Sequence, residues 1–511
     1  MTFESQVSRG ELDPARPAIV LPRRTLIVAV GGLLLTLMLA ALDSTIVATA
    51  MPRIVADLNG FSQYTWVTIA YLLTSTISVP LVGKLVDQYG RRLFLISGTL
   101  IFIAASVLCA VAATFDQLVA FRLIQGLGGG MLTASVFAAV PTLFAPLDRP
   151  RIVGLFTGTY GLSSIVGPLL GGIITDSIGW RWVFMVNLPL GLVALGLVLA
   201  TYPDDRPQLV GGGRTAVDLP GAALLVGAAT PILLALTLGG REVAWRSPQM
   251  AALLGVAAVC AVGFIRAEQR APDPMVPLGL LRSRTVGIPL LSTLLMSAGF
   301  FAALLFTPLF VQGVIGRTAT QSGGVLAPMM LAWVLASVIV GQLIARAGRT
   351  RLSGLVGMLV GGLGLALMGG MGADTDYAVV VRNLVVVGFG LGAALPAFAI
   401  AVQNAVPLRQ TGIATALSTF TRALGNTLAS AALGGVFAAL VGGSASASVA
   451  PEVLDSALSA TFRVAAVVVW IGAGVTLLLR EAPLRPRGRA GRETRERQTG
   501  PVREVSSVGV S

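Results

Sequence analysis

The sequence is short of the residues that build most catalytic and metal sites. Its 511 residues include no histidine, only two cysteines and a single lysine. Without histidine, histidine metal ligation and histidine acid–base catalysis are excluded. Cys109 and Cys260 both fall in apolar runs, where cysteine behaves as a small hydrophobic residue, and they indicate neither a disulfide framework nor a metal site. We therefore predict no metal and no cofactor.

Charge is also scarce, since charged residues make up 12% of the chain and hydrophobic residues 55%. That balance excludes an ordinary soluble domain. A membrane-spanning helix needs about 20 mostly apolar residues. The sequence contains fourteen such runs, at roughly 25–48, 63–82, 93–113, 117–140, 152–175, 180–201, 218–238, 249–265, 286–313, 322–345, 352–372, 377–401, 412–440 and 460–479. We predict an all-α polytopic membrane protein with 14 transmembrane helices.

The net charge of +13 follows the loops of this topology. If the N-terminus is cytoplasmic, inner loops and tails hold 27 of the 36 Lys and Arg residues and outer loops hold seven. This bias predicts that both termini are cytoplasmic and that the protein lies in a bacterial inner (plasma) membrane. The charge is explained by topology, so nucleic acid is not an expected partner.

A repeated segment divides the chain into related parts. Residues 83–92, GKLVDQYGRR, return in altered form at 341–350 as GQLIARAGRT. Pairing the two copies maps spans 1–6 onto spans 9–14 and leaves spans 7 and 8 as an insertion. Two six-helix halves of this kind are used by secondary transporters. We predict an N-terminal tail (1–24), an N-terminal half (25–201), linkers with inserted helices 7 and 8 (202–284), a C-terminal half (285–479) and a disordered basic cytoplasmic tail (480–511).

Two charged residues inside the predicted spans are candidates for proton coupling. Asp43 lies near the outer end of span 1, and Arg122 lies at a similar depth in span 4. Charge within hydrocarbon is costly and indicates function. An arginine that moves during a conformational change would switch a facing acid between its protonated and ionised forms. The alternative is a static pair that fastens span 1 to span 4.

The segment 83–92 is a candidate gating loop on the cytoplasmic side. Gly83 and Gly90 permit a sharp turn, and Arg91 and Arg92 hold the segment inside. Asp87 has no counterpart in the second copy, where alanine stands. A carboxylate is stabilised at a helix N-terminus, so Asp87 is expected to latch onto the start of span 13. In the alternative, Asp87 only offsets the neighbouring arginines.

Span 5 is unusually rich in glycine. A smooth helix of this composition allows close approach and sliding of a neighbour, although glycine-driven packing alone is common in membranes. The residues concerned are Gly158, Gly161, Gly167, Pro168, Gly171 and Gly172.

Aromatic and basic residues in the second half are candidates for a substrate cavity. Aromatic side chains suit flat or cationic substrates, whereas lipid-facing or core packing is the alternative. Arg422 lies near the middle of span 13, where it can contact substrate or bridge backbone carbonyls. The aromatic candidates are Phe300, Phe301, Phe306, Phe310 and Phe420.

The ordered set of motifs resembles the major facilitator superfamily, and in particular its fourteen-helix drug/proton antiporters of the EmrB/QacA type. LDSTIVATAMPRI, GKLVDQYGRR, RLIQGLGGG, the GPLLGG core of span 5, WRWVFMVNLPLG and TGIATALSTFTRALGNTLASAALGGVF carry this resemblance. It implies proton coupling through Arg122 and an antiporter role for span 5. Met51 departs from the pattern, which has leucine there.

From these features we predict a membrane transporter and not an enzyme. The expected activity is proton-coupled export of hydrophobic, cationic organic compounds by alternating access, a multidrug efflux that would confer antibiotic resistance. The alternative is an exporter of a lipid, a self-made antibiotic or a siderophore on the same fold. The expected partners are a small-molecule substrate, protons and membrane lipids, and we expect a monomer. No nucleophile–base constellation or phosphate loop supports an enzyme.

Overall fold

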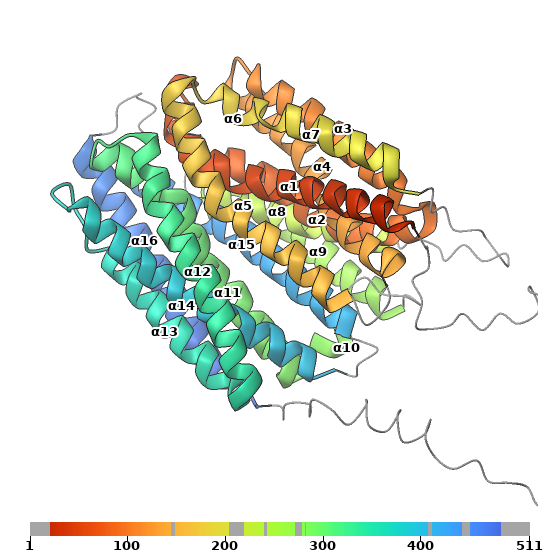
Figure 1. Ribbon diagram of the computed structural model, residues 1–511. Coiled ribbons are helices and arrows are strands. Elements are labelled where there is room, and N and C mark those ends of the chain that lie inside the picture. The colour runs from red at the N-terminus through yellow and green to blue at the C-terminus, as the bar shows by residue number, and fades with distance from the viewer. Residues whose placement is uncertain are drawn as a thin grey trace, which may run out of the picture.

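The chain is almost entirely helical in the computed structural model, which describes residues 21–144, 149–203, 219–239, 243–270, 278–281, 283–406, 411–441 and 450–481. The elements are α1 (Arg23–Asp57), η2 (Phe61–Gln63), α2 (Trp66–Tyr89), α3 (Arg91–Ala110), α4 (Phe115–Leu143), α5 (Arg149–Ser177), α6 (Arg181–Met185), α7 (Asn187–Thr201), α8 (Leu219–Leu238), α9 (Pro248–Arg270), α10 (Leu278–Leu281), α11 (Arg284–Leu309), η3 (Phe310–Val314), α12 (Ala319–Ala347), α13 (Thr350–Met368), α14 (Tyr377–Asn404), α15 (Thr411–Val441) and α16 (Pro451–Thr476). Figure 1 shows their arrangement.

Twelve helices in the described part of the chain are long and apolar enough to cross a membrane. Two of the fourteen predicted spans are not among them. Span 152–175 coincides with α5, which is helical but carries many Gly, Ser and Thr residues. Span 218–238 coincides with α8, whose apolar stretch Ala223–Leu236 is shorter than a span. The structure thus shows an all-helical membrane protein with twelve candidate spans.

The helices form two bundles with the same internal pairing. In the N-terminal bundle (α1–α7), α4 packs against α2 and α3, and α7 packs against α1 and α3. In the C-terminal bundle (α11–α16), α14 packs against α12 and α13, and α16 packs against α11 and α13. Between the bundles, α5 contacts α12 and α2 contacts α15. Helices equivalent in the sequence repeat therefore occupy equivalent positions.

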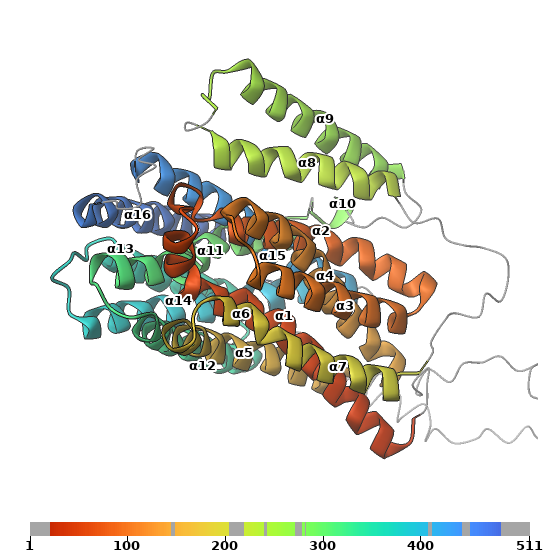
Figure 2. The same ribbon diagram turned by 90° about the horizontal axis from the view of Figure 1, so that it is seen from above.

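The helices between the bundles form a separate hairpin. α8 and α9 pack mainly against each other, and α8 also contacts α2 and α15. Ile69 of α2, Leu233 of α8 and Ala431 of α15 form one small buried cluster. Figure 2 shows the hairpin outside the remaining helices. The hairpin therefore covers the α2–α15 seam and leaves the α5–α12 seam uncovered by it.

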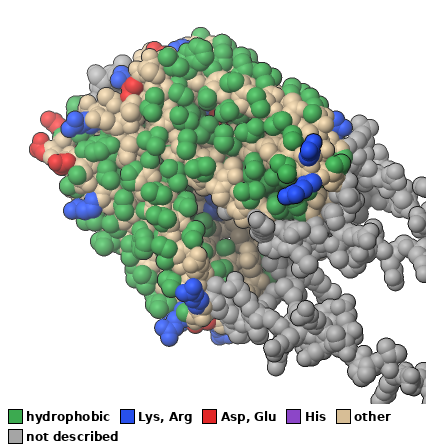
Figure 3. All heavy atoms as spheres, in the orientation of Figure 1, with side chains coloured by type: hydrophobic (Ala, Val, Ile, Leu, Met, Phe, Trp, Pro, Cys, Tyr) green, Lys and Arg blue, Asp and Glu red, His purple; other side chains and the backbone are tan. Residues whose placement is uncertain are grey.

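The surface has the character expected of a membrane protein. Hydrophobic side chains cover most of the face in Figure 3, while charged side chains gather toward its ends. Large exposed apolar residues recur along α9 and α12, for example Val259 and Val338. In water such a surface would drive association, whereas lipid tails solvate it at no cost.

The repeated segment is more helical than the sequence indicates. Residues 83–89 continue α2, so Gly83 lies inside a helix and forms no turn. The chain reverses at Gly90 alone, where φ is +91° and ψ is 151°. Gly348 also ends α12 at positive φ, but in the left-handed helical region, with φ of +74° and ψ of 1°. Side-chain-bearing residues avoid these conformations, which explains the glycine at this position of both copies.

Alanine at the two glycines of the first copy should have opposite effects. Gly90→Ala forces a side chain into a region that is essentially restricted to glycine, which costs about 1–3 kcal/mol. Gly83→Ala meets no atom within 4 Å and gains helix propensity of at most about 1 kcal/mol. The apparent melting temperature in detergent should fall for Gly90→Ala and stay level or rise for Gly83→Ala. Equal losses for both would contradict the assignment of the turn to Gly90.

Candidate functional site

The N-terminal bundle buries an ion pair between α1 and α4. Arg122 Nη1 donates to Asp43 Oδ2 at 2.6 Å. Asp43 is 0% exposed and Arg122 is 2% exposed. Two charges withdrawn from water in this way are tolerated only when their remaining hydrogen-bonding groups also find partners. The structure therefore brings together the two residues that the sequence marks as candidates.

Two amide side chains complete the coordination of Asp43. Gln125 Nε2 donates to Asp43 Oδ1 at 2.9 Å, and Asn187 Nδ2 donates to the same oxygen at 3.0 Å. Both amides also donate to Ser106 Oγ, at 2.7 and 3.2 Å. The four elements α1, α3, α4 and α7 thus meet at one buried polar cluster, which we call the Asp43 cluster (Asp43, Ser106, Arg122, Gln125 and Asn187).

The guanidinium group is held from several sides. Arg122 Nη1 also donates to Gln125 Oε1 at 2.7 Å, and Nε donates to the Val67 carbonyl at 3.3 Å. The guanidinium carbon Cζ of Arg122 lies 4.3 Å from the centroid of the Tyr71 ring and 5.8 Å from the centroid of the Phe184 ring. A desolvated guanidinium gains from an aromatic face. Arg122 is consequently oriented precisely, and its position is coupled to α2.

Sequence reasoning missed the two amides, although both lie in motifs it used. Gln125 stands three residues after Arg122 and therefore on the same face of α4. Asn187 opens α7 within WRWVFMVNLPLG and is 0% exposed. A neutral amide in an apolar run costs less than a charge, so neither residue stands out by composition. The i, i+3 spacing from Arg122 is the signal that could have found Gln125.

The seam between the bundles is sealed at the end remote from the start of α1 and the end of α16. We call this end the distal side, where α1 and α5 end and α12 begins, and the other end the terminal side. Tyr64 donates its hydroxyl to the Leu305 carbonyl at 2.9 Å, which ties the N-terminal bundle to α11. Gln312 in the π-helical turn η3 donates to the Thr49 carbonyl of α1 at 2.9 Å. These hydrogen bonds cross from one bundle to the other.

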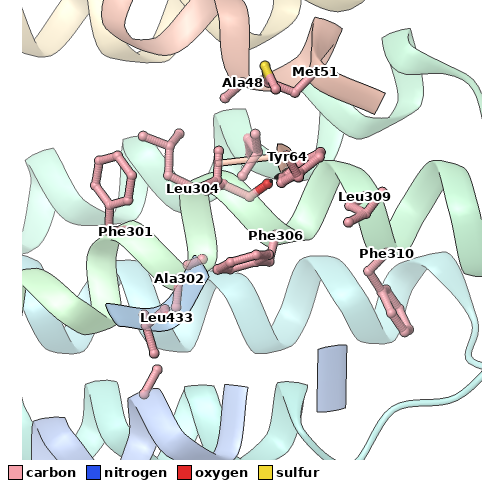
Figure 4. Close-up of a cluster of buried hydrophobic side chains, with 14 of the residues drawn as sticks. Ala48, Met51, Tyr64, Phe301, Ala302, Leu304, Phe306, Leu309, Phe310 and Leu433 are labelled. Carbon is pink, nitrogen blue, oxygen red and sulfur yellow. Dashed lines mark hydrogen bonds between the residues drawn. The ribbon is translucent and has the colours of Figure 1, made fainter. Parts of the chain in front are cut away.

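Aromatic rings fill the same seal. The Phe306 ring lies 6.1 Å from the Tyr64 ring and 5.3 Å from the Phe437 ring. Phe301 and Phe310 are also buried in this cluster, as Figure 4 shows. We call this set of rings the distal plug (Tyr64, Phe301, Phe306, Phe310 and Phe437). The structure thus places three of the predicted cavity phenylalanines in core packing, the alternative that the sequence left open.

The other predicted cavity residues lie apart from the plug. Phe300 packs on Trp333 with ring centroids 4.6 Å apart. Phe420 packs against a small cluster formed by α11, α14 and α15. Arg422 is partly exposed, and no hydrogen bond or ion pair of its side chain is found among the described residues. The structure does not bring these residues together at one site.

The glycines of α5 divide into two groups. A methyl group on Gly167 would overlap Thr45 of α1, and one on Gly171 would overlap Ile46. One on Gly172 would overlap the backbone of Ala319 in α12. Toward the terminal side, Gly158 has no neighbour within 4 Å. At the glycine positions, α5 is therefore most closely packed against α1 and α12 on the distal side.

The other two predicted positions of α5, Gly161 and Pro168, also pack more closely toward the distal side. A methyl group on Gly161 would be at ordinary contact distance, 3.4 Å, from Val334 of α12. Pro168 lies inside α5, and its carbonyl faces Gly323 of α12, where a methyl group would overlap it. At these positions the glycine of one helix has no side chain, so the backbone of the other helix can approach closely.

An acid at the end of α5 caps the first turn of α12. Asp176 accepts hydrogen bonds from the backbone N–H groups of Ala319 and Thr320 at 3.3 and 2.7 Å, and from the Thr320 hydroxyl at 2.6 Å. Burial opposes its charge, but the hydrogen bonds from Thr320 and Ala319 outweigh that effect and hold the pKa of the carboxyl below 3.8. This contact joins the two bundles, and sequence reasoning missed it.

The predicted gating segment is partly described. Arg92 donates to the Leu199 carbonyl at 3.0 Å and so holds the start of α3 to the end of α7. Arg91 begins α3 directly after the turn at Gly90. The side chain of Asp87 lies outside the described residues, as do the side chains of the first residues of α15. The predicted latch therefore remains a prediction.

A family model described as the Major Facilitator Superfamily matches residues 33–430. The chain belongs to this superfamily. It is 39% identical over 420 residues to the multidrug transporter protein MdtP of Bacillus subtilis (strain 168), covering 82% of this chain and 76% of that protein. It is 36% identical to multidrug resistance protein 3 of the same organism, covering 78% and 77% of the two chains.

The chain is also similar to more distant proteins. The efflux pump dotC of Dothistroma septosporum is 32% identical, with 80% of this chain and 70% of that protein covered. A crystal structure of a bacterial homologue of the human lysosomal transporter Spinster has a TM-score of 0.62 at 17% identity. It covers 91% of this chain and 100% of that one, which supports the fold. Membership identifies the chain as a multi-pass membrane transporter and not an enzyme.

Alanine at Gly172 should loosen the distal side of the α5–α12 seam. The added methyl group meets the backbone of α12, which cannot rotate away, and overpacking of this kind costs about 1–3 kcal/mol. Hydrogen–deuterium exchange of peptides from the distal ends of α5 and α12 should increase. Gly158→Ala, where the methyl group has open space in this structure, is the matched control and should not increase that exchange. The same exchange in both variants would contradict a glycine-dependent seal.

Removal of the Asp176 carboxylate should expose the start of α12. Asp176→Ala leaves the N–H groups of Ala319 and Thr320 without their acceptor, so exchange of these amides should rise. Because the folded pKa is lowered, the stabilisation is fully present above pH 3.8 and is lost as pH falls through the folded pKa. The difference from wild type should therefore be constant from pH 5 to pH 8. Asp116→Ala, at the exposed first turn of α4, should not alter α12 exchange.

Proposed function

We propose that the protein is a proton-coupled antiporter that exports hydrophobic organic compounds, cations among them, by alternating access. The buried pair of Asp43 and Arg122 carries this proposal. In the described transmembrane part, Asp43 is a fully buried carboxylate whose charge is balanced by a single cation. Protonation of Asp43 would remove the attraction between α1 and α4 and so bias the packing of the N-terminal bundle. The names of the Bacillus relatives support drug export.

The charge bias and the relatives support the proposed location and topology. The terminal side is the cytoplasmic side, with both termini there, and the bacterial relatives favour the plasma membrane. A 29-residue helix is about 43 Å long, so α5 is long enough to span. With α5 and α8 counted, the chain has fourteen spans, as in the EmrB/QacA type of drug/proton antiporter, with domains at 25–201 and 285–479 and the 202–284 insertion between them.

Alternating access would move the two bundles about the seam. The distal plug, Gln312 and Asp176 close the distal side in this structure. On the terminal side Gly158 of α5 has no close neighbour. In the opposite state the terminal-side part of α5 would close on α12, with Gly158 taking the role that Gly172 has here. Asp87 would then latch onto the start of α15, as Asp176 latches onto α12.

The decisive experiment is transport by the purified protein in liposomes under an imposed pH gradient. Asp43→Asn keeps the size of the side chain and, with one acceptor oxygen and one donor group, resembles the protonated acid, but it cannot bind or release a proton. Gradient-driven transport of a fluorescent organic cation should fall to the level of empty liposomes, while gradient-independent exchange of the compound persists. Asp116→Asn, the same substitution at an exposed site, should transport normally.

Three outcomes have distinct meanings. Unchanged gradient-driven transport by Asp43→Asn would rule out its coupling role. Transport of a lipid analogue or a neutral antibiotic, with no transport of any cation, would replace the drug-efflux substrate by the alternative substrate class. Stimulation of wild-type transport by the gradient, lost only in Asp43→Asn, is the result expected.

A further inference from the structure

The Asp43 cluster is rich in hydrogen-bond donors. Asp43 Oδ1 accepts from Gln125 and Asn187, and Asp43 Oδ2 accepts from Arg122. This arrangement suits the ionised carboxylate, which only accepts hydrogen bonds. A carboxylic acid has in addition an O–H group, which needs an acceptor of its own. In a fully buried site, leaving that group unpaired is unfavourable.

Most acceptors near Asp43 are already engaged. Gln125 Oε1 accepts from Arg122 at 2.7 Å and from the Cys109 thiol at 3.6 Å. Ser106 Oγ accepts from both amides. Asn187 Oδ1 is different, because it is fully buried and has no hydrogen-bond partner. Within the described part of the cluster it is the side-chain acceptor that remains uncommitted.

Among the described residues, the other titratable or charged groups around Asp43 do not provide an acceptor for its O–H group. Around Asp43 these are Arg122 on α4, Tyr71 on α2 and Cys109 on α3. Tyr71 donates its hydroxyl to the Ala40 carbonyl at 3.4 Å, and Tyr160 of α5 lies beyond it. α7 carries no titratable residue. α11 and α12, which also pack on α1, have arginines only toward the terminal side, at Arg284 and Arg346.

We propose that Asn187 is the positioning residue that serves both forms of Asp43: its amide N–H₂ group donates to the carboxylate, and its free Oδ1 accepts the proton-bearing O–H once Asp43 is protonated. Rotation of the terminal amide by about 180° exchanges the donor for the acceptor without moving α7. The inference rests on the proposed proton coupling. It adds that the site is built to hold a proton, and not only to anchor α1 to α4.

Gln125 provides a matched comparison. Both amides donate to Asp43 Oδ1 at nearly equal distance, and both contact Ser106. They differ in that the Gln125 oxygen is engaged by Arg122, whereas the Asn187 oxygen is free. Gln125→Met removes a donor that serves the ionised form only. Asn187→Leu, of similar shape, removes a donor and the acceptor that serves the protonated form.

The test is infrared difference spectroscopy of the purified protein in lipid across a pH titration. The signal is the carboxylic C=O band that disappears in Asp43→Asn. In Gln125→Met its midpoint should move to higher pH by roughly one to two units, because a hydrogen bond to the charged form is lost. In Asn187→Leu the midpoint of the same band should move by less than half of the shift in Gln125→Met, because this change removes a hydrogen bond from the charged form and one from the protonated form. The band of Asn187→Leu alone should shift in frequency, since the O–H group has lost its acceptor.

Each other result has a defined meaning. A midpoint in Asn187→Leu that moves as far as in Gln125→Met would show that Asn187 is only a donor and would overturn the inference. An unchanged midpoint and band with a lowered melting temperature would assign Asn187 to packing alone, which also overturns it. The absence of any band that depends on Asp43 in wild type, together with gradient-independent transport, would instead refute the proposed proton coupling itself.

Discussion

The cost of burying Asp43 and Arg122 is the constraint on which the N-terminal bundle depends. Neither charge can be left in the interior without the other, and neither is satisfied by the other alone. α3 and α7 therefore supply Ser106 and Asn187, α4 supplies Gln125, and α2 supplies the Tyr71 face. The packing of five helices is organised around one ion pair. A change in the charge of that pair is consequently felt by all of them.

α1 connects this cluster to the seam between the bundles. Asp43 is followed on the same helix by Thr45 and Ile46, which fit against Gly167 and Gly171 of α5. α5 in turn presents Gly172 and Asp176 to the first turns of α12. The polar cluster and the distal seal are therefore two ends of one continuous set of contacts. In the proposed mechanism, protonation at one end alters the fit at the other through α1 and α5.

The Asp176 contact between the bundles and the Asp43 cluster within one bundle differ in chemistry. The Asp176 contact is exposed and its carboxyl remains ionised over the ordinary pH range, so it fixes geometry without sensing protons. The Asp43 cluster is fully buried, and its contacts depend on whether the carboxylate is charged. The distal plug adds apolar area that is lost when the seam opens. Closure on the distal side is thus held by packing and helix capping, whereas the proposed proton site lies within one bundle.

The sequence by itself determined the all-helical membrane class and the two charged residues that the structure brings together. Hydropathy decides these features because a bilayer admits only long apolar helices, and because a rare charge within them stands out. The turn at Gly90 was also predictable, although its neighbour Gly83 proved to be helical. Only the tertiary structure decided which neutral groups complete the site. Gln125, Asn187 and Asp176 act through contacts with helices distant in the chain. Phe306 packs in the seal because of the face that α11 turns toward Tyr64 and α15. Such pairings depend on how helices are rotated and packed against one another, and composition and spacing along one helix do not specify that.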